Sequence, residues 1–170
     1  VSALWQAWCQ YCRKVVLHSV KGAVTLSGST TTCAHSGLSD LEIFFLAKQL
    51  GNKANITKIK AIKGNYQEPT WGDAVKLNLI VNGMGTSNSS DLVQAFSACL
   101  LLKDLQLCRN ASAHISQDLI QSVAGAKVRY VSTDFRHPSD LIFWIDPANQ
   151  SYLWKSWISE MRLVAQLAIK

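Results

Sequence analysis

The sequence predicts an all-α protein, a helical bundle with one or two long inserted loops. Apolar residues recur every three or four positions over several long segments, which is the spacing of amphipathic helices. The chain is 48% apolar and 16% charged, a composition typical of a folded protein and not of a disordered one. Because there is no repeat and no clear linker, residues 1–170 are expected to form a single domain.

Helical spacing is found in three segments of the first half, residues 2–20, 40–50 and 71–81. Ser39 has the properties of an N-cap, and Gly51 follows the last apolar position of the helix that Ser39 would begin. Residues 27–36 are rich in Gly, Ser and Thr and are expected to form a loop. Residues 52–70 match no regular pattern.

Three helices are expected in the second half, over residues 91–108, over residues 112–124, and after Asn149 as an N-cap. The first of them follows a polar loop, residues 83–90, with Asn88 or Ser90 as its cap. Residues 128–132 and 141–145 are expected to pair as a small β-hairpin or to form short helical turns. The longest apolar runs are too short to cross a bilayer, so no membrane partner is expected.

The net charge of +6 comes from the first part of the chain. Residues 1–63 hold eight Lys and Arg and two acidic residues, whereas residues 64–170 hold nine of each sign. Four lysines follow one another with no acidic residue between them: Lys53, Lys58, Lys60 and Lys63. They are candidate RNA-binding residues because a basic segment can follow a phosphate backbone, although a solvated lysine-rich surface has the same pattern.

Five cysteines, an odd number set mostly among apolar residues, indicate free thiols in a reducing cytoplasm. One alternative is a zinc-bearing interaction domain, since zinc ligands of the right type occur at Cys9, Cys12, Cys33 and His35. Cysteines three positions apart in an apolar helix are more often packing residues. The sequence therefore predicts no metal site and no cofactor.

The strongest candidate for chemistry is the stretch Arg109-Asn110-Ala111-Ser112-Ala113-His114. Histidine exchanges protons near neutral pH, and the planar arginine side chain fits a phosphate and the charge of its transition state. Arg13 and His18 have the same spacing, but a lysine and not an asparagine follows Arg13. Arg109, Asn110 and His114 are therefore the predicted catalytic residues for cutting RNA without a metal.

Five positions along a regular helix place Arg109 and His114 about 140° apart. Two arrangements would bring them to one phosphate. The helix breaks near Asn110, a good N-cap residue, or the side chains of two subunits meet at a dimer axis. We expect the break. His114 would then accept the proton of a ribose 2′-OH or protonate the leaving oxygen, and Asn110 would orient the histidine or the phosphate.

The Arg-polar…His pattern resembles the signature of the HEPN superfamily, in which four to six residues separate Arg and His. Two further segments suggest similarity to its RiboL-PSP type, the Trp5/Trp8 helix with Arg13 and the closing segment from Trp154 to Arg162. The resemblance implies a HEPN-like helical bundle and a homodimer whose two motifs face each other. It also implies a ribonuclease that acts as a toxin or antiphage defence effector, with an antitoxin or regulatory protein as partner. The alternative within the superfamily is an inactive scaffold that binds RNA or a partner.

Overall fold

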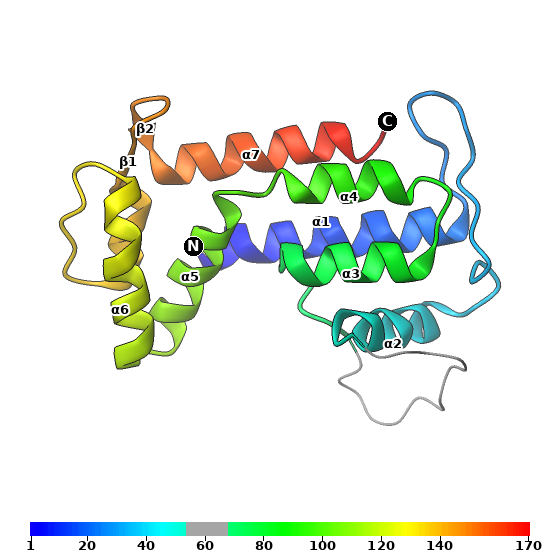
Figure 1. Ribbon diagram of the computed structural model, residues 1–170, viewed down its shortest axis with the longest axis horizontal. Helices are drawn as coiled ribbons and strands as arrows, with labels where there is room; N and C mark the ends of the chain where they lie inside the picture. Colours follow the sequence, from blue (N-terminus) through cyan, green and yellow to red (C-terminus); the bar gives the residue numbers. More distant parts are fainter. Residues whose placement is uncertain (54–67) are drawn as a thin grey trace. The chain divides into compact units, whose positions relative to one another are not determined.

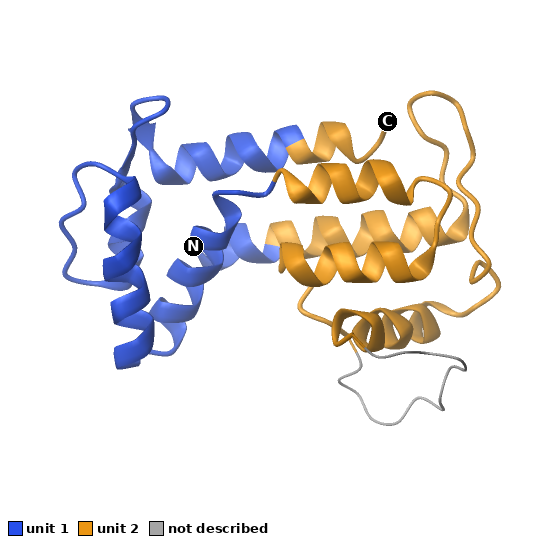
Figure 2. Cartoon of the chain, in the orientation of Figure 1, with its two compact units in different colours: residues 1–6, 99–163 blue, residues 7–98, 164–170 orange. Residues whose placement is uncertain are grey.

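The computed structural model describes residues 1–53 and 68–170, and these residues are mostly helical with one small antiparallel sheet (Figure 1). The all-α class with a small hairpin is therefore confirmed. The chain separates into two compact units, residues 1–6 with 99–163 and residues 7–98 with 164–170 (Figure 2). Within the described residues, no helix combines the length and the apolar character needed to cross a membrane.

The described residues of the second unit contain α1 (Ser2–Lys21, from residue 7 on), α2 (Asp40–Gly51), α3 (Ala74–Met84), α4 (Ser89–Ser97) and the end of α7 (Leu153–Leu167, from residue 164 on). Helix α3 packs against both α2 and α4 (Figure 1). Trp8 of α1 is 2% exposed and meets Phe96 of α4 edge to face, with ring centroids 6.4 Å apart. Its indole N–H donates to the carbonyl of Gly72 at 3.1 Å. The tryptophan-bearing first helix thus packs as its apolar spacing predicted.

The helix ends of this unit follow local rules. Ser39 caps α2 in a capping box with Glu42, as predicted, and Asp73 caps α3 by accepting from two backbone N–H groups. The helix expected over residues 71–81 is α3, which begins at Ala74 and continues to Met84. Gly83 is needed inside the helix, since an added Cβ would lie 2.4 Å from a methyl carbon of Leu50.

The first unit is built around α5 (Leu102–Ala113) and α6 (Gln117–Ala126), which lie side by side (Figure 1). Two 3-10 helices follow, η1 (Lys127–Arg129) and η2 (Pro138–Phe143). The strands β1 (Ile145–Asp146) and β2 (Ser151–Tyr152) come next, and α7 (Leu153–Leu167) belongs to this unit up to residue 163. Trp144 and Trp157 are fully buried in this unit. Helix α5 also packs against η2, and the thiol of Cys108 donates to the carbonyl of Pro138 at 3.3 Å.

The small sheet differs in part from the predicted hairpin. Val131 does form an antiparallel bridge to Ile145, but the two-stranded sheet pairs Ile145 with Tyr152 and Asp146 with Ser151. The prediction that Asn149 caps the last helix was also wrong. Asn149 lies in the tight turn between the strands, where its side chain accepts from the N–H of Ser151 at 2.9 Å. Asparagine suits both roles because its side chain bonds nearby backbone groups.

The single helix predicted over residues 91–108 is two helices, α4 and α5, separated at residues 98–101. Glu160 of α7 causes the second start, because its carboxylate accepts from the backbone N–H groups of Leu100, Leu101 and Leu102 at 2.8–3.0 Å. These are the orphan donors of a helix N-terminus, for which a negative charge is favourable. The capping residue lies about 60 residues away in the sequence, so the apolar periodicity of residues 91–108 could not predict this helix start.

Replacing Glu160 with Ala should lower the free energy of unfolding by about 1–3 kcal/mol, because three N–H groups would lose a charged acceptor. Urea denaturation of the two proteins measures the difference. Glu160→Gln keeps the shape and one acceptor oxygen, so its loss should be smaller. Equal stability of the Ala variant and the wild-type protein would contradict this role for Glu160.

Candidate catalytic site

The predicted catalytic residues lie on the last turn of α5 and just beyond it. The helix runs without a break from Leu102 to Ala113, so the expected break at Asn110 is wrong. Asn110 caps nothing, because its side-chain oxygen accepts from Nη1 of Arg109 at 3.1 Å and its carbonyl accepts from the N–H of His114 at 2.8 Å. The next helix begins at Gln117, with Ser116 as its N-cap, and not at Ser112.

His114 is the C-cap residue of α5 and has a non-helical backbone, with φ −138° and ψ 86°. It opens the exposed three-residue connection, residues 114–116, between α5 and α6. In the part of the chain that the structure describes, no hydrogen bond engages its imidazole. An exposed imidazole without a fixed partner is available to a ligand and to proton exchange with solvent.

Arg109 is half-buried at the edge of the helix face that packs into the unit, next to the buried Cys108. Its guanidinium donates to the neutral amide of Asn110, and among the described residues no carboxylate lies within ion-pair distance of it. No carboxylate of the described residues balances this guanidinium, which has donors available for an anion.

The pair with the same spacing, Arg13 and His18, behaves differently. Arg13 donates twice to the carboxylate of Glu68, at 2.7 and 3.0 Å, and its guanidinium lies 4.0 Å from the ring centroid of Phe44. Burial raises the pKa of Glu68, but hydrogen bonds from Arg13 and Trp71 outweigh it and the pKa is lowered overall. Arg13 is thus a structural residue of the second unit with its charge already balanced.

An intact α5 has a geometric consequence for Arg109 and His114. Arg109 lies on the helix, whereas His114 lies one residue beyond its end with a non-helical φ of −138°, so the angle of about 140° between positions of a regular helix does not apply to this pair. Of the two arrangements that the sequence allowed, the break at Asn110 is wrong and the dimer axis stays a prediction. A two-fold axis beside the last turn of α5 would bring the arginine of one subunit toward the histidine of the other.

A buried carboxylate that the sequence did not reveal holds the neighbouring turn against α5. Asp104, which is 5% exposed, accepts from Nη2 of Arg129 at 2.5 Å and from the hydroxyl of Tyr130. Burial, and then the bond with Asp104, raises the pKa of the Tyr130 hydroxyl, so this group remains a donor. Asp104 precedes Arg109 on the same helix, and its bonds position α5 relative to η1.

The structure describes one of the four lysines of the predicted RNA-binding surface. Lys53 is exposed, directly after α2, with a left-handed backbone (φ 59°). Lys58, Lys60 and Lys63 lie outside the described residues. Binding of RNA by these four lysines stays a prediction.

None of the five cysteines, which all lie within the described residues, forms a disulfide, as their number and setting predicted. The four ligands of the zinc alternative do not gather: within residues 1–53 and 68–170 no three His, Cys, Asp or Glu side chains form a group that could hold a metal. Cys33 instead donates to the carbonyl of Met84 at 3.3 Å.

Comparisons of the chain with family models, curated proteins and solved structures found no match. The resemblance to the HEPN superfamily therefore depends on the residues of the motif alone.

Cys99 and Cys108 should resist alkylation in the native protein. Burial raises the pKa of Cys99 to about 12 and that of Cys108 to about 11, so neither forms appreciable thiolate, the reactive species, near neutral pH. Iodoacetamide should modify the half-buried Cys9 and Cys33 before the buried cysteines, as read by mass spectrometry of peptides, whereas all five should react in denaturant. Labelling of Cys99 as fast as Cys33 would contradict the burial.

Proposed function

We propose that the protein is a metal-independent endoribonuclease whose active site is formed by Arg109, Asn110 and His114 of two subunits. One observation carries the proposal: the last turn of α5 is bracketed by an arginine that, among the described residues, donates to a neutral amide and to no carboxylate, and by an exposed imidazole. A guanidinium and an imidazole that can reach one phosphate are the two groups needed for phosphodiester transesterification.

In this mechanism Arg109 binds the scissile phosphate and stabilises the charge that develops on its oxygens. Asn110 holds the guanidinium at 3.1 Å, so it orients the arginine and not the histidine. This differs from the role that the sequence suggested for Asn110.

His114 takes the proton of the ribose 2′-OH, and the 2′-oxygen attacks the adjacent phosphorus. The bond to the 5′-oxygen breaks, and the leaving oxygen receives a proton from solvent. The products are a 2′,3′-cyclic phosphate and a 5′-OH. DNA, which lacks the 2′-OH, is not a substrate.

The resemblance to HEPN proteins extends the proposal to a biological role, an RNA-cleaving toxin or defence effector restrained by an antitoxin or regulatory partner. The alternative is an inactive scaffold of the same kind, which would bind RNA or a partner without cutting it. Cleavage in the absence of metal separates the two.

RNA incubated with the protein in excess EDTA should be cut, and His114→Ala should reduce the rate by about 10²–10⁴-fold because an acid–base group is lost. His18→Ala is the matched control, since His18 is an exposed helical histidine that follows Arg13 at the same spacing. The control should cleave at the wild-type rate. Equal cleavage by the His114 and His18 variants would remove His114 from the chemistry.

Mixing equal amounts of Arg109→Ala and His114→Ala proteins tests the shared site. If each site takes its arginine from one subunit and its histidine from the other, every mixed dimer keeps one intact site. Random exchange then restores about a quarter of the wild-type activity, whereas each variant alone has almost none. If the mixture is no more active than its components, the two residues act within one subunit.

A further inference from the structure

An apolar pocket within the second unit is lined by α1, by the loop after α1 and by the residues that follow α7. Its volume is about 240 Å³, just below the range of about 300–1,000 Å³ that holds drug-sized ligands, so it suits a small molecule. Tyr11, Val15 and Ser19 line it together because residues four positions apart lie on one side of a helix. Ala168 and Ile169 complete the wall.

The turn at the end of α1 directs the loop back along the helix. Gly22 follows α1 with a left-handed backbone (φ 97°), and the N–H of Ala23 donates to the carbonyl of His18 at 3.0 Å, as in a Schellman motif. The N–H of Leu26 donates to the carbonyl of Ile169 at 2.8 Å. These backbone bonds hold the wall in place, so little of the chain has to be ordered when a ligand binds.

Tyr11 presents an aromatic surface to the pocket. Its ring stacks on Trp8, with centroids 5.7 Å apart, and its hydroxyl donates to the carbonyl of Ala165 at 3.3 Å. Because the hydroxyl already has a partner, the ring contributes an apolar face of fixed position.

Large apolar side chains remain exposed at this pocket. Val24 is 69% exposed and Ile169 is 42% exposed, and both line it. Leu26, which is bonded to Ile169 through the backbone, is 76% exposed. Exposed apolar side chains that gather at one place are typical of a binding surface, whereas scattered ones are not.

The charged groups of this pocket are all basic. Lys14 and His18 line it, and among the described residues of the lining none is acidic. All eleven Asp and Glu residues of the chain are described, and none of them lies within ion-pair distance of Lys14. An ammonium group without a carboxylate partner, beside an apolar wall, is complementary to a ligand with one apolar part and one negative charge.

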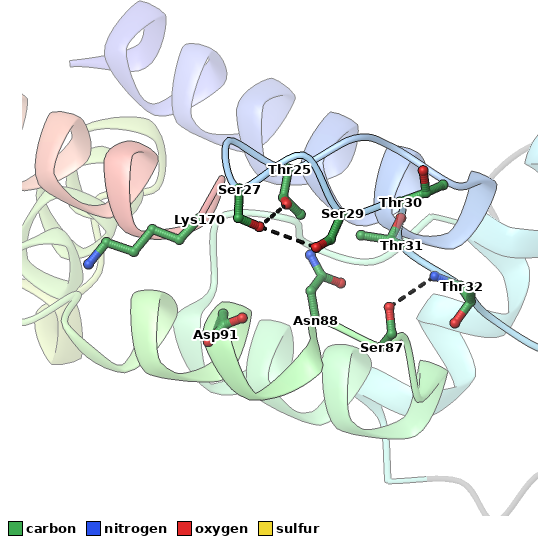
Figure 3. Close-up of a pocket in the computed structure, with 10 residues that line it drawn as sticks. All are labelled: Thr25, Ser27, Ser29, Thr30, Thr31, Thr32, Ser87, Asn88, Asp91 and Lys170. Atoms are coloured by element: carbon green, nitrogen blue, oxygen red, sulfur yellow. Dashed lines mark hydrogen bonds between the residues drawn. The ribbon is translucent and has the colours of Figure 1, made fainter.

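A larger pocket of about 350 Å³ shares part of this wall but is polar (Figure 3). Its hydroxyl groups bond one another, as Thr25 and Ser27 do at 2.8 Å. One acidic residue and one basic residue line it, Asp91 and Lys170. Of the two pockets, only the apolar one therefore has basic groups without an acidic group, so the negative end of a ligand is expected at Lys14.

We propose that the apolar pocket binds a small monocarboxylate. Its hydrocarbon part lies against Tyr11, Val24 and Ile169, and its carboxylate pairs with the ammonium group of Lys14. Burial of the hydrocarbon provides the affinity, and the ion pair selects a negative head group. Medium-chain fatty acids and aryl alkanoic acids share this chemistry. The site contains none of the residues proposed for RNA cleavage, so it does not depend on that activity.

The probes are octanoate, 3-phenylpropionate and octylammonium, titrated separately into the full chain and followed by amide shifts in ¹H–¹⁵N NMR spectra. At least one carboxylate should bind below about 10 mM and shift the amides of Val24 and Ile169. The tighter of the two identifies an aliphatic or an aromatic ligand. Octylammonium has the tail of octanoate with the opposite charge and should bind more weakly, by about tenfold. No binding of either carboxylate at about 10 mM, or octylammonium binding as tightly as octanoate, would overturn the proposal.

Lys14→Glu tests the ion pair. Lys14 is exposed, so the variant should fold, and it should lose the preference for octanoate over octylammonium because attraction becomes repulsion. Lys103→Glu is the matched control, since Lys103 is an exposed helical lysine that lines neither pocket, and it should keep the wild-type preference. A preference for octanoate that survives in Lys14→Glu would show that Lys14 does not bind the carboxylate.

Val24→Asp tests the apolar wall. The substitution removes an apolar contact and adds a negative charge, so octanoate should bind about tenfold more weakly. Val75→Asp is its control, because Val75 is 60% exposed and lines neither pocket. Unchanged affinity in Val24→Asp, or an equal loss in Val75→Asp, would overturn the site. So would a dimer that Val24→Asp dissociates while octanoate fails to bind, because the surface would then be an interface between copies of the chain.

Discussion

The beginning of α5 depends on one carboxylate. Glu160 of α7 accepts from three consecutive backbone N–H groups and so determines where α4 ends and α5 starts. Without this cap the periodic apolar sequence from residue 91 to 108 favours one long helix. The start of α5 in turn sets the direction of every later side chain on it, including the inward Cys108 and the half-buried Arg109. Asp104 strengthens the same helix from inside by binding Arg129 and Tyr130.

Local signals were sufficient for much of the fold. The cap at Ser39, the helix stop at Gly51 and the packing of the first helix by its tryptophans follow from residues that are close in sequence. The errors have a different origin. Glu160 acts across about 60 residues, and Gly83 lies inside α3 at a position where Leu50 of another helix leaves little room for a side chain. Asn110 is a residue type that often caps helices, but here its side-chain oxygen accepts from the neighbouring Arg109 and the helix continues through it.

For the candidate site, the sequence identified the residues but not their arrangement. Arg13 and Arg109 have the same chemistry and the same distance to a histidine, and only their surroundings separate them. A carboxylate that accepts two hydrogen bonds neutralises Arg13, whereas a neutral amide leaves the charge of Arg109 available. The sequence contained one sign of this difference, the asparagine directly after Arg109.

The hydroxyl-rich segment from residue 27 to 36 shows how one composition fits two roles. Ser and Thr are common in loops because they bond their own backbone, and this explains most of the segment. It does not explain Thr31, which is 4% exposed and whose Oγ1 has no hydrogen-bond partner among the described residues. A loop needs no buried polar side chains, and each one lowers stability unless something pairs with it. Composition therefore predicts that this segment is a loop but not which of its hydroxyl groups is buried.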